Sequence, residues 1–255
     1  YDQRISVRGT DEIAELAASF NQMADAVSTH INAVTATAEE QKLLLAALTH
    51  ELKTPMTSII GYSETLMRTK LNKVQREEAV SYLHAECARL ERLTQKMMRL
   101  ITLSGGDEIM LARLPVKTLF ALAEPTLKEA AARQDVRLQF YCGEESFCMD
   151  ADLMVSVLIN LADNAMAAGA KNVQIVCASN AITVRDDGCG IPKAMLGRVT
   201  QPFFRADKAR GRAKGNAGLG LALVERIAKL HGAALEIESE EGAGTTVSLR
   251  FGKDA

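Results

Sequence analysis

The stretch ALTHELKTP, residues 47–55, decides the fold of the first half of this chain. It lies within a long run of helix-favouring residues, yet it ends in Pro55. A proline inside a helix costs about 3 kcal/mol, because it lacks an N–H and clashes with the carbonyl four residues back. His50 lies about 200° around the helix from Leu48 and Leu52, since each residue turns by about 100°. The pattern predicts a helix that holds His50 toward solvent, with Pro55 as a hinge beyond it.

Apolar residues recur on both sides of this stretch at steps of three and four, the spacing of a coiled-coil seam. The seam positions are Ile13, Leu16, Phe20, Met23, Val27, Ile31, Val34, Ala38, Gln41, Leu45, Leu48 and Leu52. The steps from Met23 to Val27 and on to Ile31 are both four residues, so the seam slips there as in a stutter. The sequence predicts a long helix with an irregular middle.

A second helical pattern runs from 74 to 103, after a short turn at 69–73. With the end of the first helix it makes a helical hairpin over residues 38–103. Such a hairpin leaves an apolar stripe uncovered, and two hairpins cover each other in a four-helix bundle. We therefore expect an all-α dimeric four-helix bundle, formed by a homodimer.

The sequence pattern changes after SGGDE, residues 104–108. Strands are expected at 136–142, 172–178, 181–187, 233–239 and 245–251, and helices at 117–133, 150–168 and 218–231. Strand pairs with helices between them predict an α+β two-layer sandwich, with helices on one face of a mixed sheet. The Gly-rich, basic segment 188–217 is expected to be a long structureless loop, of the kind that often serves as a lid.

Composition narrows the class of protein. The net charge of −2 over 255 residues gives no basic signal for nucleic acid. No run of eighteen apolar residues is present, so no membrane span is expected within these residues. The sequence starts at Tyr1 without a Met or a signal peptide, so we expect a fragment of a longer protein. The five cysteines form no C-x-x-C pair and are expected to be reduced thiols.

Three motifs in the second half could each bind a ligand, and each also has a plain structural reading. DDGCGIP (186–192) places a carboxylate at a strand end before two glycines, which is also a common turn. NAGLGLALV (216–224) opens a helix whose N-terminus suits phosphate, although many such glycine clusters are only turns. NLADN (160–164) puts two asparagines on one helix face, where they either bind Mg²⁺ or are solvated.

The order of these motifs behind a His-bearing hairpin resembles the sensor histidine kinases of bacterial two-component systems, with their GHKL-type ATP-binding domain. HELKTP resembles the H-box, NLADN the N-box and DDGCGI the first glycine box. PFFR (202–205) resembles the F-box, and GLGL (218–221) the second glycine box. DEIAELAASFNQM (11–23) is similar to the last helix of a HAMP linker.

The resemblance implies four segments and a set of site residues. The segments are a HAMP remnant and coiled coil (1–35), a dimerisation and phosphotransfer domain (36–104), a linker (105–113) and an ATP-binding domain (114–255). The catalytic residues would be His50, Glu51, Thr54 and Arg205. The nucleotide-binding residues would be Asn160, Asn164, Asp186, Gly188, Gly190, Ile191, Phe204, Arg205, Lys208, Gly215, Gly218, Leu219, Gly220, Leu221 and Thr245.

Within this set, the resemblance assigns His50 as the phosphoacceptor, Asp186 as the partner of the adenine amino group and Arg205 as a γ-phosphate contact. Asn160 would also be the Mg²⁺ ligand. Thr54, one turn after the histidine, resembles the phosphatase motif, although a threonine there can simply bond a backbone carbonyl. The family often has a lysine where this chain has Ala167, and Lys208 is the cation expected to replace it.

The implied protein binds ATP and Mg²⁺, phosphorylates itself on His50 and passes the phosphoryl group to an aspartate of a response regulator. It would be the cytoplasmic portion of a bacterial inner-membrane protein, anchored through segments absent from this fragment, without nucleic acid as a partner. Two alternatives stay open. One is a chaperone-type GHKL ATPase that does not phosphorylate itself, and the other is a degenerate kinase that acts as a docking adaptor.

Overall fold

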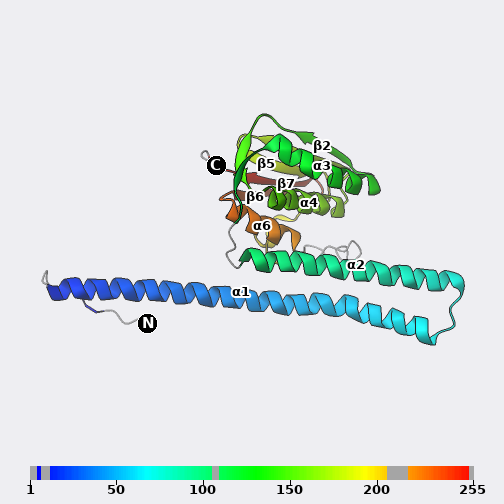
Figure 1. The fold of residues 1–255 in the computed structure, drawn as a ribbon, viewed down its shortest axis with the longest axis horizontal. Helices are drawn as coiled ribbons and strands as arrows, with labels where there is room; N and C mark the ends of the chain where they lie inside the picture. The colour runs from blue at the N-terminus through cyan, green and yellow to red at the C-terminus, as the bar shows by residue number, and fades with distance from the viewer. Residues whose placement is uncertain (1–4, 7–11, 105–108, 206–217, 253–255) are drawn as a thin grey trace. The chain divides into compact units, whose positions relative to one another are not determined.

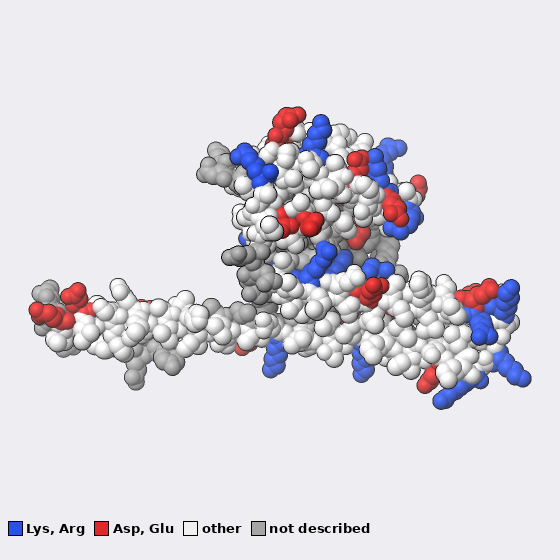
Figure 2. Space-filling model, in the orientation of Figure 1, with Lys and Arg blue, Asp and Glu red and all other residues white. Residues whose placement is uncertain are grey.

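The computed structural model describes residues 5–6, 12–104, 109–205 and 218–252. The chain divides into two compact units, Tyr1–Thr57 and Ser58–Ala255. Within the described residues, no helix combines the length and the apolar character that a membrane crossing requires. On the visible face of the second unit, acidic and basic side chains are interspersed rather than gathered by sign (Figure 2).

The first unit consists mainly of helix α1, which runs from Glu12 to Arg68 and so continues into the second unit (Figure 1). The helix is unbroken at Pro55. The predicted long helix is therefore confirmed. At its start, the side chain of Asn21 bonds both backbone groups of Ile5, at 2.9 and 2.8 Å. The seam side chains at this end, including Ile13 and Leu16, are exposed in the single chain.

In the second unit, the last turns of α1 lead into α2 (Lys73–Ser104), and the predicted hairpin is confirmed. A reciprocal cap starts α2: Asn72 and Gln75 each accept the other's backbone N–H through the side chain, at 2.8 and 3.1 Å. Tyr62 of α1 and Tyr82 of α2 stack with their ring centroids 4.3 Å apart. These contacts fix the turn of the hairpin.

The rest of the second unit is a two-layer α/β domain. Its main sheet has the order β2-β4-β5-β7-β6, with β2 and β4 parallel and the other pairs antiparallel. The strands are β2 (Arg137–Tyr141), β4 (Asn172–Ala178), β5 (Ala181–Asp186), β6 (Ala234–Glu240) and β7 (Gly244–Arg250). Helices α3 (Val116–Arg133), α4 (Ala151–Ala167) and α6 (Gly220–Leu230) pack against one another and the sheet (Figure 1). The predicted mixed-sheet sandwich is confirmed.

The helical layer follows from apolar stripes on amphipathic helices. In α4 the stripe includes Met154, Val157, Leu158 and Leu161, all 3% exposed or less. Facing residues of β4 and β5, such as Ile175, are fully buried as well. The core therefore lies between α4 and the middle of the sheet, and it leaves the polar side chains of α4 at one edge of that layer.

Two short strands and one short helix were not predicted. Strand β1 (Ala112–Pro115) pairs antiparallel with β3 (Ser146–Met149) in a second, two-stranded sheet. The 3-10 helix η1 (Lys193–Arg198) lies within segment 188–217, so the prediction of a structureless loop is wrong for that part. Pro192 starts η1 with a preset φ of −58°, and its carbonyl accepts the N–H of Met195 at 2.9 Å.

Candidate active site

The side chain of His50 points to solvent, as its helical position predicts. It is 72% exposed, and its Nδ1 lies 3.8 Å from Oε1 of Glu51, a side chain that is 22% exposed. This distance is too long for a hydrogen bond and short enough for electrostatic attraction. Because Nδ1 faces the carboxylate, Nε2 is the ring nitrogen on the other side, away from Glu51.

The hydroxyl of Thr54 differs from those of the other threonines nearby. Thr49 donates to the carbonyl of Leu45 at 2.9 Å, and Thr57 donates to that of Lys53 at 2.8 Å, the usual arrangement of threonine in a helix. Thr54 makes no such bond to any residue that the structure describes. Its hydroxyl is therefore available to another partner.

Helix α4 positions the two asparagines of the NLADN motif. Asp150 caps the helix by accepting the N–H of Leu153 at 3.0 Å, which fixes where α4 begins. Asn160 is 3% exposed, and its Nδ2 donates to the carbonyl of Ser156 at 2.7 Å. Its Oδ1 is buried without a hydrogen-bond partner among the described residues. A buried amide oxygen without a donor is uncommon and suggests a missing ligand.

The start of α6 lies directly against these asparagines. A Cβ on Gly220 would come within 3.3 Å of Oδ1 of Asn164 and 3.4 Å of Oδ1 of Asn160. Any side chain at Gly220 would therefore press against both amide oxygens. The structure therefore brings the second glycine motif and the asparagine pair together, as the sequence predicts.

The PFFR motif meets the same glycine segment. Phe203 donates its N–H to the carbonyl of Gly218 at 2.8 Å. Gly218 has φ of +72°, and a Cβ there would lie 2.7 Å from the carbonyl oxygen of Phe204. Only glycine fits this position without strain. The guanidinium of Arg198 in turn lies over the ring of Phe204, 4.9 Å from its centroid.

Asp186 ends β5, beside Thr245 of the neighbouring strand β7. Its Oδ1 accepts the N–H of Gly188 at 2.8 Å. Burial raises the pKa of the Asp186 carboxyl, and backbone hydrogen bonds from Gly188 and Thr245 partly oppose this rise. A carboxylate held by these two backbone donors still has lone pairs that can accept a further donor.

The turn after Asp186 packs against the β6–β7 connection. Gly190 has φ of +67°, and a Cβ there would collide with the carbonyl of Glu240. The N–H of Ile191 donates to Oγ of Ser239 at 2.8 Å, and that hydroxyl also lies 2.9 Å from Oγ1 of Thr245. Ser239, which the sequence analysis missed, thus ties the first glycine motif to Thr245.

The remaining predicted residues divide into two groups. Leu219 is completely buried, so only its backbone can reach a ligand, whereas Leu221 and Arg205 are half-buried. Lys208 and Gly215 lie outside the described residues, so their predicted contacts stay predictions.

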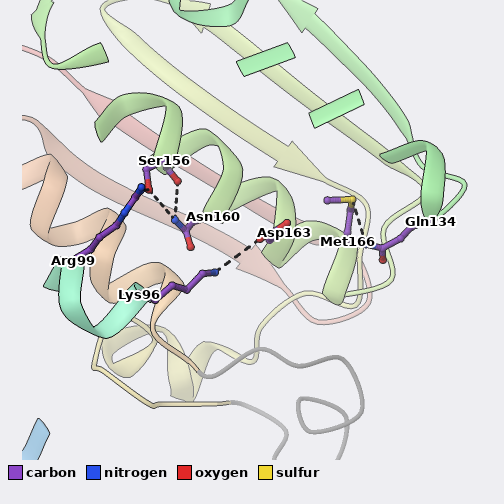
Figure 3. A network of polar contacts seen from close by, with 7 residues as sticks. All are labelled: Lys96, Arg99, Gln134, Ser156, Asn160, Asp163 and Met166. Carbon is purple, nitrogen blue, oxygen red and sulfur yellow. Dashed lines mark hydrogen bonds and ion pairs between the residues drawn. The ribbon is translucent and has the colours of Figure 1, made fainter. Parts of the chain in front are cut away.

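A polar network on α4 was also missed (Figure 3). Nη1 of Arg99, in α2, donates to Oγ of Ser156 at 3.0 Å, and Lys96 lies 3.9 Å from Asp163. The partners are about sixty residues apart in sequence, so no local pattern reveals them. The spacing of Ser156, Asn160 and Asp163, which marks one polar face on an otherwise apolar helix, was the available signal.

Known families match three successive parts of the chain. Residues 1–29 match the HAMP domain, and residues 40–106 match the His Kinase A (phospho-acceptor) domain. Residues 149–255 match the family described as histidine kinase-, DNA gyrase B-, and HSP90-like ATPase. The asparagine pair, Asp186 and the two glycine motifs lie in this last segment, and His50 lies in the phospho-acceptor segment.

Two solved structures show the same fold. Acinetobacter baumannii histidine kinase AdeS aligns over 79% of this chain and 97% of its own, with a TM-score of 0.59 and 18% identity. Full-length ShkA in complex with AMPPNP aligns over 80% of this chain and 44% of its own, with a TM-score of 0.58 and 23% identity.

Curated relatives are more similar in sequence. Sensor histidine kinase YkoH of Bacillus subtilis is 30% identical over 97% of this chain, and YclK of the same species is 27% identical over 98%. The chain spans about half the length of these two relatives, 54% and 55%. Histidine protein kinase SaeS of Staphylococcus aureus is 30% identical over 95% of this chain, which covers 72% of SaeS. Because its phospho-acceptor and ATPase segments match known families and it is 30% identical to SaeS over most of both chains, this chain belongs to the sensor histidine kinase family.

Proposed function

We propose that this chain transfers the γ-phosphoryl group of ATP to His50 and then to an aspartate of a response regulator. The observation that carries the proposal is the buried Oδ1 of Asn160, which has no hydrogen-bond partner among the described residues and lies against Gly220 at the start of α6. A helix N-terminus presents N–H groups and positive potential to phosphates. ShkA, which shares this fold, was solved in complex with AMPPNP, and this supports a nucleotide as the ligand.

The adenine end of the nucleotide would lie at Asp186. Backbone N–H groups of Gly188 and Thr245 hold this carboxylate, and its remaining lone pairs would accept the adenine amino group. Thr245 lies next to it on β7 and is half-buried. The phosphate end would lie at Gly218 and Gly220, with Arg205 of the PFFR motif as the γ-phosphate contact.

The residues present fit a magnesium ion. An amide oxygen is a hard ligand of the kind that Mg²⁺ takes together with substrate phosphates, and Oδ1 of Asn160 is such an oxygen without a donor among the described residues. Asn164 lies one turn further, against the same glycine. When bound, the ion neutralises charge on the phosphates, which is the main requirement of phosphoryl transfer.

His50 would act as the nucleophile through Nε2, the ring nitrogen away from Glu51. Its lone pair forms a bond to the γ-phosphorus, and the bond from phosphorus to the bridging oxygen breaks, so that ADP leaves with that electron pair. The ring becomes cationic, and the Glu51 carboxylate facing Nδ1 stabilises this charge. A receiver aspartate then attacks the phosphorus, and the N–P electrons return to Nε2.

The partners follow from the same segments. We propose a homodimer through the exposed seam of α1 and the phospho-acceptor hairpin, and a receiver domain as the acceptor of the phosphoryl group. The whole protein would be a bacterial inner-membrane protein, with this portion on the cytoplasmic side. The segment boundaries 35/36, 104/105 and 113/114 remain those proposed from the sequence.

A phosphatase activity toward the phospho-regulator is the second candidate function. The hydroxyl of Thr54 favours it, because among the described residues this hydroxyl makes no hydrogen bond, whereas those of Thr49 and Thr57 donate to backbone carbonyls. Oriented water near a phospho-aspartate would need a hydrogen-bond partner of this kind. Thr54→Ala should lower dephosphorylation of the regulator and leave phosphorylation of His50 intact.

Incubation with γ-labelled ATP tests the kinase proposal directly. The parent chain should acquire label that is stable to base and lost in acid, and His50→Gln should acquire none. ATP turnover without label in the parent would instead support the chaperone-type ATPase. Neither label nor turnover, with nucleotide still bound, would support the docking adaptor.

A further inference from the structure

Helix α4 presents its polar side chains to α2 and to the nucleotide site from one face. Ser156, Asn160 and Asp163 follow at steps of four and three residues, so their side chains lie in one row. Across from this row, Lys96 and Arg99 project from α2 (Figure 3). The proposed magnesium ligand therefore lies between two residues that α2 holds.

The amide of Asn160 has a fixed orientation because of Ser156. Nδ2 donates to the Ser156 carbonyl at 2.7 Å and lies 3.5 Å from its Oγ, so two acceptors face the NH₂ group. A rotation of the amide by half a turn would place Oδ1 against these oxygens instead. The amide oxygen therefore points away from the Ser156 oxygens, as Figure 3 shows.

Arg99 fixes Ser156 in turn. Its Nη1 donates to the Ser156 Oγ at 3.0 Å, which holds this hydroxyl in the rotamer that faces Asn160. A cavity of about 800 Å³ between α2 and α4 is lined by Arg99, Ser156 and Asn160, so a ligand bound at Asn160 would also border α2. The Lys96–Asp163 pair, 3.9 Å apart, anchors the next turn.

We propose that Arg99 of α2 is a positioning residue for the metal-bound nucleotide, acting through Ser156 on the amide oxygen of Asn160. The proposal rests on the proposed function, because it concerns the same nucleotide site. It adds that α2, a helix of the phosphotransfer hairpin, helps to hold that site in position. Metal affinity and the contact between α2 and α4 are then coupled, so each strengthens the other.

The test compares Arg99→Met with Arg92→Met in the full chain. Arg92 lies on the same helix, lines the same cavity and also places positive charge near Asp163, but it makes no hydrogen bond to α4 among the described residues. Because of these properties, Arg92→Met controls for the loss of charge alone. Binding of a non-hydrolysable ATP analogue to each variant is measured at increasing Mg²⁺ and also in EDTA.

We expect Arg99→Met to raise the Mg²⁺ concentration at half-saturation about tenfold, as is typical when the partner of a metal ligand is removed. Binding in EDTA should stay within about twofold, since this readout does not involve the metal. Ser156→Ala should give the same shift, and the double variant no further one, because both act along one path. Arg99→Lys should restore most of the affinity.

An unchanged Mg²⁺ midpoint in Arg99→Met, or an equal shift in Arg92→Met, would overturn the inference. An equal loss of binding in EDTA would also overturn it, since it would indicate a general structural role. If the parent chain itself binds no nucleotide, the proposed function fails and this inference falls with it. These results are distinct from one another.

Discussion

At the scale of single residues, substitution of Gly220 is expected to weaken nucleotide binding without lowering the stability of the fold. Its position at the start of α6 needs no positive φ, but an added Cβ would come within 3.3–3.4 Å of the two asparagine amides. Alanine favours helix over glycine by roughly 0.5–1 kcal/mol. We expect Gly220→Ala to weaken nucleotide binding at least about tenfold, which is a loss of about 1.4 kcal/mol in binding free energy. The melting temperature should stay level or rise.

Gly197→Ala is the matched control for this prediction. Gly197 lies in η1, and a Cβ there would meet no atom within 4 Å. Calorimetric titration and thermal melts of both variants provide the measurement. Equal nucleotide affinity in the two variants would show that the space above Gly220 is not used by the ligand.

Asp186 and Asp187 are neighbours whose pKa values shift in opposite directions. Burial raises the pKa of Asp186. Hydrogen bonds from the backbone and side chain of Asn172 lower that of Asp187, which also accepts the N–H of Lys171 at 2.7 Å. The same change, aspartate to asparagine, should therefore have opposite effects on stability.

For Asp186, the unfolded chain releases its proton near the ordinary value of 3.8, before the folded chain does. Stability is therefore lost as pH rises from 3.8 through the raised folded pKa. Asp186→Asn removes this penalty, so we expect a higher melting temperature than the parent at pH 7 and no advantage near pH 3. Thermal melts across this range provide the measurement.

For Asp187, the pKa in the folded chain lies below 3.8. Its contribution to the stability of the fold is therefore complete above pH 3.8 and is lost as the pH falls through the folded pKa. Asp187→Asn should therefore be less stable than the parent at pH 7, and the two should converge in strong acid. A variant difference that does not change with pH would contradict the assignment for either residue.

How far the sequence predicts the site depends on the distance between partners. The asparagine pair and the glycines stand at motif spacings, and the structure brings Asn160, Asn164 and Gly220 together as expected. Ser239 and Arg99 could not be found in this way, because each bonds residues roughly fifty positions away. Motif spacing therefore identifies the residues that are proposed to meet the ligand, whereas the contacts that support them become visible only in the fold.

At the scale of elements, His231 joins two helices. It follows α6, where its Nδ1 bonds the carbonyl of Ile227 at 2.8 Å, and its Nε2 accepts the N–H of Asp150 at 3.0 Å. The ring is 7% exposed, so a lost bond would leave a buried backbone donor without a partner. Such a group costs about 1–3 kcal/mol.

We therefore expect His231→Phe to lower the free energy of unfolding by about 1–3 kcal/mol. His84→Phe, at an exposed position of α2, is the control and should change it little. Denaturant titration of both variants measures the difference. Equal stability of parent and His231→Phe would mean that the bond to Asp150 contributes nothing.

The elements themselves were predicted where their periodicity is long. Apolar residues at steps of three and four predicted α1 and α2, and short runs of β-favouring residues predicted the five strands of the main sheet. Strands β1 and β3 have only four residues each, and β1 ends in a proline, so neither has a readable pattern. Their pairing joins Ala112 to Met149 across α3, and no local rule predicts such a contact.

At the scale of the whole molecule, the proposed homodimer would cover the exposed seam of α1. Phe20 is 44% exposed in the single chain, and Met23 is 59% exposed. Burial of a side chain of this size contributes about 1.5–3 kcal/mol. Phe20→Asp should therefore raise the dissociation constant of the homodimer at least about tenfold.

Analytical ultracentrifugation of Phe20→Asp beside Gln22→Asp measures this effect. Gln22 is exposed and lies outside the seam, and its substitution introduces the same carboxylate. Equal dissociation of the two variants would place the dimer contact elsewhere than on this seam.

The uninterrupted course of α1 from Ile13 to His50 has a mechanical consequence. The helix is continuous over roughly 55 Å, so a rotation of the helix near the first seam residues is transmitted to the imidazole of His50. Insertion of one residue between them would rotate the direction of the His50 side chain around the helix axis by about 100°. Insertion of four residues would bring it back to within about 40° of its original direction.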